Sequence, residues 1–323
     1  MYYIRIMADE MTDFLARVPG SGYSWGTFET AHQMNPDGVE GKSRVVTDAV
    51  PIGTHYTFRR YAPLLEFSGL FRTFGLDTEP TEDGVSTFAN KYGVLGLPLG
   101  ILFPLGGGKS HLGTGEILES WTREIVDMRL GVKLWDAARG KSLAELSRVI
   151  HWSDDKTVNY NDPESGRFAV IAGKETRPDI LERLKTRDLI APAYWYLQGV
   201  INGKLDKHNV TGRLLWDARD PKAQQLAVHL VPKNLIGCLW LQFAKALEGK
   251  DYRQCENCKL WFEIGGSRGA RADKKFCSAT CKAALHRKER ERAISLRAAG
   301  RTAGQIAREL GKDIELVKGW VSK

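Results

Sequence analysis

Four of the five cysteines in this chain of 323 residues fall between positions 255 and 281, in two closely spaced pairs. Cys255 and Cys258 form a Cys-x2-Cys pair, and Cys277 and Cys281 form a Cys-x3-Cys pair whose members lie one helical turn apart. Two such pairs can supply four thiolates to one tetrahedral ion, as in structural zinc sites. The spacing predicts one structural Zn²⁺ bound by Cys255, Cys258, Cys277 and Cys281.

Other interpretations of these residues stay open. The four cysteines could be free thiols with accidental spacing, since a disulfide framework needs a secretory context. His286, five residues after Cys281, could replace one cysteine as a ligand. Cys238 lies in an apolar run and is interpreted as a small buried hydrophobic residue rather than a fifth ligand. Because so short a segment buries little apolar surface, bound metal would supply much of its folding free energy.

The residues between the two cysteine pairs predict a small hairpin. Residues 260–264 are of β type and follow the first pair. Residues 265–269 are rich in glycine and can turn the chain back towards Lys275 and Phe276. The strand over residues 260–264 is therefore expected to pair with the segment that contains Lys275 and Phe276.

A helix is predicted to follow the second pair. Ser278 is a suitable N-cap, which places Cys281 in the first turn, where the positive end of the helix dipole faces the thiolate-bound metal. Knuckle, hairpin and ligand-bearing helix together indicate a treble-clef zinc finger over residues 251–292.

This segment resembles the CGNR-type zinc finger, found at the C-terminus of proposed bacterial regulators whose N-terminal region is known as the ABATE domain. The resemblance rests on the two cysteine pairs, the Trp261-Phe262 strand, the basic loop over residues 268–275 and the basic helix after Cys281. Where that family carries Cys-Gly-Asn-Arg, this chain reads Cys281-Lys282-Ala283-Ala284, so the match is to a broader treble-clef relative. Residues 88–96 and 215–217 also resemble segments of uncharacterised bacterial proteins with this finger. This resemblance implies no established activity.

Composition and charge narrow the class of protein. Hydrophobic residues make up 42% of the chain, which is ordinary for a soluble globular protein of two or three domains. No segment approaches a membrane span or a cleavable leader, so a cytoplasmic location without a membrane partner is predicted. Residues 251–323 hold 17 Lys and Arg against 9 Asp and Glu, whereas the first 250 residues hold 30 of each. The net charge of +8 therefore lies entirely in the C-terminal segment.

Localised positive charge beside a metal site is typical of a module that binds nucleic acid through its phosphates. The alternative is a solvated basic helix that offsets the negative charge of the metal thiolates. The favoured partner is DNA, and the residues expected to contact it are Arg268, Arg271, Lys274, Lys275, Arg287, Lys288, Arg290 and Arg292.

Residues 293–323 predict a helix-turn-helix. Thr302 and Gln305 have the spacing of a capping box, Gly311 is a stop signal, and Asp313 can cap a last helix. The expected small core consists of Leu296, Ile306, Ala307, Leu310, Val317 and Trp320.

This spacing resembles the helix-turn-helix of DNA-binding regulators. The last helix carries Glu315 and lysines but no Arg, Asn or Gln that could read a base edge, so it is expected to bind the DNA backbone. A helical cap used for packing or dimerisation is the alternative.

The first 250 residues predict a mixed α+β body that is mostly helical with small β-hairpins. The helix over residues 116–139 carries an apolar residue every three or four positions along one face, which indicates a core helix. Its stripe is Leu118, Trp121, Ile125, Met128, Val132 and Trp135. Further helices are expected over residues 63–74, 81–92, 142–150, 189–205 and 234–247, and strands over residues 2–6, 56–61, 156–160, 167–172 and 225–231.

Residues 93–115 are rich in glycine and are predicted to form a flexible loop. The run from Gly106 to Ser110 is similar to a phosphate-binding loop. That motif requires glycine at position 103, where this chain has Phe103, so nucleotide binding is not predicted.

A metal held by four cysteines has no open position for water or substrate, which argues for a structural ion. No catalytic residue is assigned, and His111 and residues 154–155 are interpreted as loop residues. The favoured hypothesis is a zinc-dependent, DNA-binding bacterial transcriptional regulator whose residues 1–250 sense a small-molecule ligand or form a homodimer. The alternative is an enzyme or toxin-like effector with its activity in residues 1–250 and a basic tail that docks on RNA or a partner; a substrate-sized pocket around residues 93–115 would favour it.

Overall fold

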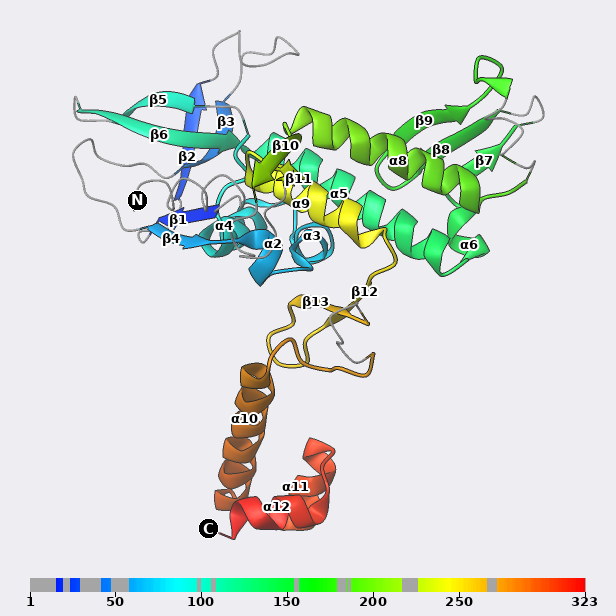
Figure 1. Ribbon diagram of the computed structural model, residues 1–323. Coiled ribbons are helices and arrows are strands. Elements are labelled where there is room, and N and C mark those ends of the chain that lie inside the picture. Colours follow the sequence, from blue (N-terminus) through cyan, green and yellow to red (C-terminus); the bar gives the residue numbers. More distant parts are fainter. Residues whose placement is uncertain are drawn as a thin grey trace. The chain divides into compact units, whose positions relative to one another are not determined.

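The chain divides into two compact units, Met1–Gly249 and Lys250–Lys323, called unit 1 and unit 2 below. In the part of the chain that the structure describes, no helix has the length and apolar content of a membrane span. The strand expected over residues 2–6 lies outside that part. The computed structural model (Figure 1) describes residues 16–19, 24–29, 42–47, 58–97, 100–105, 109–153, 157–178, 184, 187–216, 226–265 and 272–322.

Unit 1 is a mixed α+β structure built on three helices, α5 (Leu118–Arg139), α8 (Ile190–Lys207) and α9 (Leu235–Ala246). Helix α8 packs against both α5 and α9, and Figure 1 shows the three helices next to one another. Asn234 caps α9, because its side chain accepts a hydrogen bond from the N–H of Gly237 at 2.8 Å. All three predicted helices are confirmed, with ends that shift by one or two residues.

Aromatic side chains fill the core of unit 1. The ring of Phe243 on α9 stacks on Phe71 with centroids 5.3 Å apart and meets Trp135 edge-on at 5.8 Å. Trp121 packs against Phe74 with ring centroids 6.2 Å apart. Of the stripe predicted on α5, Leu118 is half-buried and the other five residues are buried: Trp121, Ile125, Met128, Val132 and Trp135.

The single helix expected over residues 63–74 is wrong, because the chain is interrupted there. Gln242 of α9 holds the interruption, donating from its amide nitrogen to the carbonyls of Pro63 and Phe67 at 2.8 Å each. Its amide oxygen accepts from the N–H of Phe71 at 3.3 Å. The two carbonyls also accept within the segment, Pro63 from the N–H of Phe67 and Phe67 from the N–H of Leu70, so Gln242 adds bonds from α9 that fix both sides of the interruption. The segments are α2 (Pro63–Glu66), α3 (Leu70–Arg72) and the π-helical turn η1 (Thr73–Asp77).

Small antiparallel sheets complete the described part of unit 1, together with helix α4 (Glu82–Tyr92), which Thr81 caps as expected. Strands β1 (Ala16–Pro19) and β4 (Phe58–Tyr61) form one pair. Strands β2 (Ser24–Glu29), β3 (Lys42–Thr47), β6 (Lys109–Ile117) and β5 (Gly100–Leu105) lie in that order in a second sheet. The others are β7 (Ile150–Trp152), β8 (Val158–Asp162) and β9 (Arg167–Ala172) in one sheet, and β10 (Thr211–Trp216) with β11 (Leu226–Val231).

Two more predictions in unit 1 need correction. Residues 93–115 are not one flexible loop, since β5 and β6 pair as an antiparallel hairpin with Phe103 opposite His111. Their glycines predicted a loop, yet the run from 100 to 105 is otherwise apolar and can extend as a strand. The helix expected over residues 142–150 is confined to α6 (Leu143–Leu146), because Ile150 enters β7 and pairs with buried Tyr160.

Unit 2 contains a two-stranded sheet followed by three helices. The expected capping box of Thr302 and Gln305 is present, Gly311 adopts a left-handed conformation with φ 61°, and Asp313 caps the last helix. The predicted boundary at residue 292 falls inside the first of these helices. The elements are β12 (Asp251–Gln254), β13 (Trp261–Ile264), α10 (Ala279–Ala298), α11 (Ala303–Leu310) and α12 (Ile314–Val321).

The three helices of unit 2 enclose their own small core, close to the predicted set. Its buried residues are Ala293, Ile306, Ala307, Val317 and Trp320, with Leu296 and Leu310 packed against them.

A buried carboxylate joins the three long helices of unit 1. Glu124 on α5 is 1% exposed and accepts from the ammonium groups of Lys204 and Lys207 on α8, each at 2.7 Å. Trp240 on α9 donates from Nε1 to the same carboxylate at 3.2 Å. Burial opposes its ionisation, but His208 Nε2, 3.2 Å away, and the charge of Lys204 outweigh burial and lower the pKa of Glu124.

Replacing Gln242 with leucine tests how the interruption before α3 is stabilised. The Gln242→Leu variant keeps the volume but removes three hydrogen bonds of a buried side chain, so we expect it to lower the free energy of unfolding by about 2–4 kcal/mol. Urea unfolding followed by tryptophan fluorescence measures the loss. The matched control Lys245→Leu, at an exposed position of α9, should change it by about 0.5 kcal/mol or less. Equal effects of the two substitutions would contradict the assignment.

Acidification tests the carboxylate of Glu124. Because its pKa in the folded protein is lowered, the stability that its ionised form contributes is present above the ordinary value of 4.5 and is lost as the pH falls below it. We expect Glu124→Gln to destabilise unit 1 by about 3–5 kcal/mol at neutral pH and by progressively less in acid. Urea midpoints across this pH range, with Glu119→Gln on the exposed face of α5 as the control, measure the difference. A destabilisation that does not depend on pH would rule out this role.

Candidate metal centre

The first cysteine pair occupies the turn between β12 and β13. The strands pair antiparallel, from Asp251 opposite Ile264 to Gln254 opposite Trp261. At the turn, the N–H of Cys255 donates to the carbonyl of Leu260 at 2.9 Å, and the N–H of Lys259 donates back to Cys255 at 2.9 Å. These bonds fold residues 255–260 into a compact knuckle with both thiols on it.

The prediction that residues 260–264 pair with the segment of Lys275 and Phe276 is wrong. Strand β13 is present as expected, but its partner is β12, which precedes the knuckle. A Cys-x2-Cys knuckle is itself a tight turn, so it brings the residues on its two sides together before the glycine-rich segment is reached. Lys275 lies outside any strand and instead accepts a hydrogen bond from the N–H of Glu256 at 3.1 Å, which ties the second pair to the knuckle.

The second cysteine pair lies at the start of α10. Ser278 is the N-cap, as predicted, and its hydroxyl accepts from the N–H of Cys281 at 3.1 Å. Cys281 consequently sits in the first turn of a helix that runs to Ala298, where the helix dipole favours a negative sulfur.

The four sulfur atoms converge on one point. All four Sγ atoms lie within 4.8 Å of one another. The Sγ of Cys277 is 3.6 Å from that of Cys258 and 3.4 Å from that of Cys281. These distances exceed a disulfide bond of about 2.05 Å, and they are near the edge of about 3.8 Å of a tetrahedron with metal–sulfur bonds of about 2.3 Å. The cysteines are positioned to bind one metal ion.

The electrostatics of the cluster favour a cation. Burial opposes ionisation of Cys255, but the N–H groups of Cys258, Cys277 and Asn257 donate to its sulfur and lower its pKa to about 6. Burial and the adjacent sulfurs raise the pKa of Cys277, and burial raises that of Cys258. Thiolates held this close together repel one another, so the cluster does not readily carry several negative charges. A bound cation relieves this repulsion. Thiolate ligands suit soft or borderline ions such as zinc, Cu(I) and iron.

A small apolar shell supports the sulfurs. Phe262 and Ile264 of β13 are buried beside Cys255, and Phe276 packs against the same cluster. Lys259 has φ 61°, a left-handed conformation that side chains with a Cβ rarely adopt. Sequence reasoning missed this residue, because lysine gives no signal for a position that normally favours glycine.

Cys238 and His286 lie apart from the metal cluster. Cys238 is buried in α9 of unit 1, as expected for a small hydrophobic residue. His286, on α10, packs edge-on against Trp320 with ring centroids 5.2 Å apart. Among the described residues, the group able to hold a metal consists of the four cysteines alone.

The described residues among those predicted to contact nucleic acid lie in the segment before α10 and on two sides of α10. Arg268 and Arg271 lie outside the described residues. The ammonium of Lys274 lies over the ring of Phe262, 5.4 Å from its centroid, and exposed Lys275 is 3.5 Å from Glu256. The others are exposed on α10, where helical spacing puts Arg287 and Arg290 on one side and Lys288 and Arg292 on another.

Lys288 and Arg292 each have a partner within unit 2. Lys288 donates to Asn257 of the knuckle at 3.3 Å, and Arg292 pairs with Glu309 of α11 at 3.3 Å. These two exposed cations therefore each have one polar contact within the unit, whereas the described residues show none for Arg287 and Arg290, which are also exposed on α10.

Comparison with known proteins gives no assignment, since no family model, curated protein or solved structure matches the chain. The resemblance to the CGNR-type finger stays a prediction.

Removing one ligand tests the metal centre. We expect the protein to carry one metal ion per chain and Cys281→Ser to lose it, with loss of ordered structure in unit 2, because metal binding and folding of so small a unit are linked. Elemental analysis and far-UV circular dichroism measure the two effects.

The matched control is Cys238→Ala, which removes the remaining cysteine and should keep the metal. Because two of the thiols have raised pKa values, metal affinity should also fall as the pH is lowered, since protons compete for the sulfurs. A protein free of metal with unit 2 fully folded would contradict this account.

Proposed function

We propose that the bound ion is Zn²⁺ and that unit 2 is a zinc-stabilised DNA-binding module. Four sulfurs at tetrahedral spacing support zinc, which prefers four thiolate ligands in structural sites. Such a site is closed to water and substrate, so its role in this proposal is to shape unit 2. A knuckle followed by a helix that carries the second pair supports a treble-clef arrangement similar to the CGNR-type finger.

The observation that carries the proposal is the placement of charge. Residues 251–323 hold 17 basic and 9 acidic residues, the entire excess of positive charge in the chain. This excess lies on the same small unit that the metal stabilises. Phosphates attract such a surface through counterion release, which supplies affinity without sequence information.

Helices α11 and α12 are proposed to act as a helix-turn-helix. The capping box at Thr302, the left-handed Gly311 and the Asp313 cap support a short, well-defined turn between helices. The exposed side of α12 includes Ile314, Glu315, Leu316 and Lys318. This side carries no Arg, Asn or Gln, so the proposed interaction is mainly with the DNA backbone.

At the level of the whole protein, the proposal is a bacterial transcriptional regulator in which unit 1 senses a ligand or forms a homodimer. The enzyme or toxin-like alternative predicted a pocket around residues 93–115. Side chains of residues 98–115 lie outside the described part, so that alternative remains a prediction without a supporting observation.

Salt dependence tests the proposal on two matched double variants. Arg287→Ala with Arg290→Ala removes two cations from the solvent-facing side of α10, and Lys288→Ala with Arg292→Ala removes two that have partners within unit 2. For a short DNA duplex, we expect the first variant to reduce the slope of log affinity against log salt by about 1.8, since each phosphate contact contributes about 0.9. The second variant should change the slope by less than half as much.

Fluorescence anisotropy between about 50 and 200 mM salt measures these slopes. Equal reductions of the slope in the two variants would mean that DNA is attracted by the net charge of unit 2 and not by the solvent-facing side of α10. Affinity that does not depend on salt, or no affinity for any duplex, would exclude the proposed function.

A further inference from the structure

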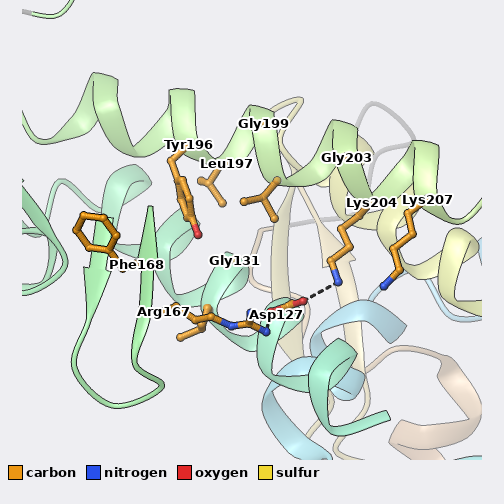
Figure 2. Close-up of a pocket in the computed structure, with 12 residues that line it drawn as sticks. Asp127, Gly131, Arg167, Phe168, Tyr196, Leu197, Gly199, Gly203, Lys204 and Lys207 are labelled. Atoms are coloured by element: carbon orange, nitrogen blue, oxygen red, sulfur yellow. Dashed lines mark hydrogen bonds and ion pairs between the residues drawn. The ribbon is translucent and has the colours of Figure 1, made fainter. Parts of the chain in front are cut away.

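Unit 1 contains a cavity of about 370 Å³ between α5, α8 and β9. Figure 2 shows Tyr196, Lys204 and Lys207 on α8, with Asp127 of α5 and Arg167 and Phe168 of β9 beneath. The volume falls within the range of small-molecule sites, which begins at about 300 Å³. None of these residues belongs to the metal centre or its helices.

Two glycines open the wall that α8 gives to the cavity. Gly199 and Gly203 are four residues apart and therefore lie on one side of the helix, and both line the cavity. A Cβ atom added at either position would meet nothing within 4 Å. Glycine is unfavourable inside a helix by about 1 kcal/mol relative to alanine. Both positions are exposed, so packing does not require these two glycines, and their lack of side chains leaves the α8 side of the cavity open.

The polar side of the cavity carries more positive than negative charge. Its lining includes the cations Arg167, Lys204 and Lys207 and the single carboxylate of Asp127. Asp127 accepts from Lys204 at 2.6 Å and from Arg167 at 2.7 Å, as Figure 2 shows for Lys204. Glu124, which pairs with both lysines, is 1% exposed and does not line the cavity. Asp162, opposite Arg167 in the register of β8 and β9, is also buried and does not line the cavity. The three carboxylates balance the three cations in total, and the positive excess belongs to the surface that a ligand meets, with three cations and one carboxylate.

The cations also keep donors available. An ammonium has three N–H donors and a guanidinium has five. Among the described residues, Lys207 makes one hydrogen bond, to Glu124, and Arg167 makes one side-chain bond, to Asp127. Their side chains are 52% and 44% exposed, so further donors can reach a molecule in the cavity.

The opposite side of the cavity is aromatic and apolar. Tyr196 is held by stacking on Tyr160, with ring centroids 4.2 Å apart and planes inclined by 14°. Phe168 lines the cavity and is 64% exposed, an unusual exposure for so large an apolar ring. Leu197 and Val200 complete this side. A rigid ring, an exposed ring and aliphatic groups suit a flat apolar body.

We infer that this cavity binds a small organic anion, a carboxylate carried on a flat, apolar ring system. The carboxylate lies against Arg167 and Lys207, and the ring lies along Gly199 and Gly203 towards Phe168 and Tyr196. Within the proposed function, this molecule is the ligand that unit 1 senses. The binding step itself does not depend on nucleic acid, so either proposal can fail while the other stands.

Calorimetry on the full-length protein, without nucleic acid, tests the inference. The probes are benzoate, 1-naphthoate and indole-3-acetate, each compared with its uncharged primary amide. We expect at least one carboxylate to bind about tenfold more tightly than its amide, because charge-assisted hydrogen bonds are about twice as strong as neutral ones and an advantage of about 1.4 kcal/mol is a factor of ten in affinity. Absence of binding by all three carboxylates, or equal binding of acid and amide, would overturn the inference.

Two variants with matched controls locate the site. Gly203→Leu fills the cavity without replacing a member of an ion pair and should weaken binding of the carboxylate by about tenfold or more. The control Asn202→Leu, at an exposed neighbouring position outside the cavity, should leave that binding unchanged. Arg167→Gln should remove the preference for acid over amide. Arg123→Gln, which deletes one charge from an exposed position of α5, should keep that preference. Binding that survives both Gly203→Leu and Arg167→Gln would place the ligand elsewhere.

Discussion

Four sulfur atoms held within 4.8 Å of one another are the constraint on which unit 2 depends. They come from two segments of different kind, a turn between short strands and the first turn of a long helix. Near the sulfurs, few apolar side chains are available, chiefly Phe262, Ile264 and Phe276. So small a core offsets little of the conformational entropy that ordering the backbone around it costs, about 1–2 kcal/mol per residue. A cation bound by the four sulfurs would remove the repulsion between thiolates, and we propose that it stabilises this part of the fold.

The two units are stabilised in different ways. Unit 1 has the aromatic core around Phe243 and Trp135, and it keeps a charged network, centred on Glu124, inside that core. We propose that this network selects one arrangement of α5, α8 and α9, as a site that holds its shape around the proposed ligand requires. Unit 2 combines a metal cluster with a three-helix core around Ile306 and Trp320, and it carries the positive charge. Ligand recognition in unit 1 and phosphate binding in unit 2 are thus proposed for separately stabilised parts.

Local signals made part of this structure predictable. The caps at Ser278, Thr302 and Asp313 are set by neighbours three residues away, and the stripe on α5 repeats within one helix, so both were predicted from the sequence. Contacts between distant residues were not. Gln242 holds an interruption more than 170 residues earlier, and Lys204 reaches a carboxylate 80 residues away. Sequence periodicity carries no information about such pairings, which left the cavity of unit 1 unpredicted.

Amide hydrogen exchange with and without a metal chelator tests the central claim most directly. If the ion holds unit 2 together, chelation will remove protection from the amides of β12, the knuckle, β13 and the first turn of α10, while the amides of α5, α8 and α9 exchange as before. Unchanged protection in the knuckle after complete removal of the metal would show that the sulfurs do not need an ion, and the account of unit 2 would fail.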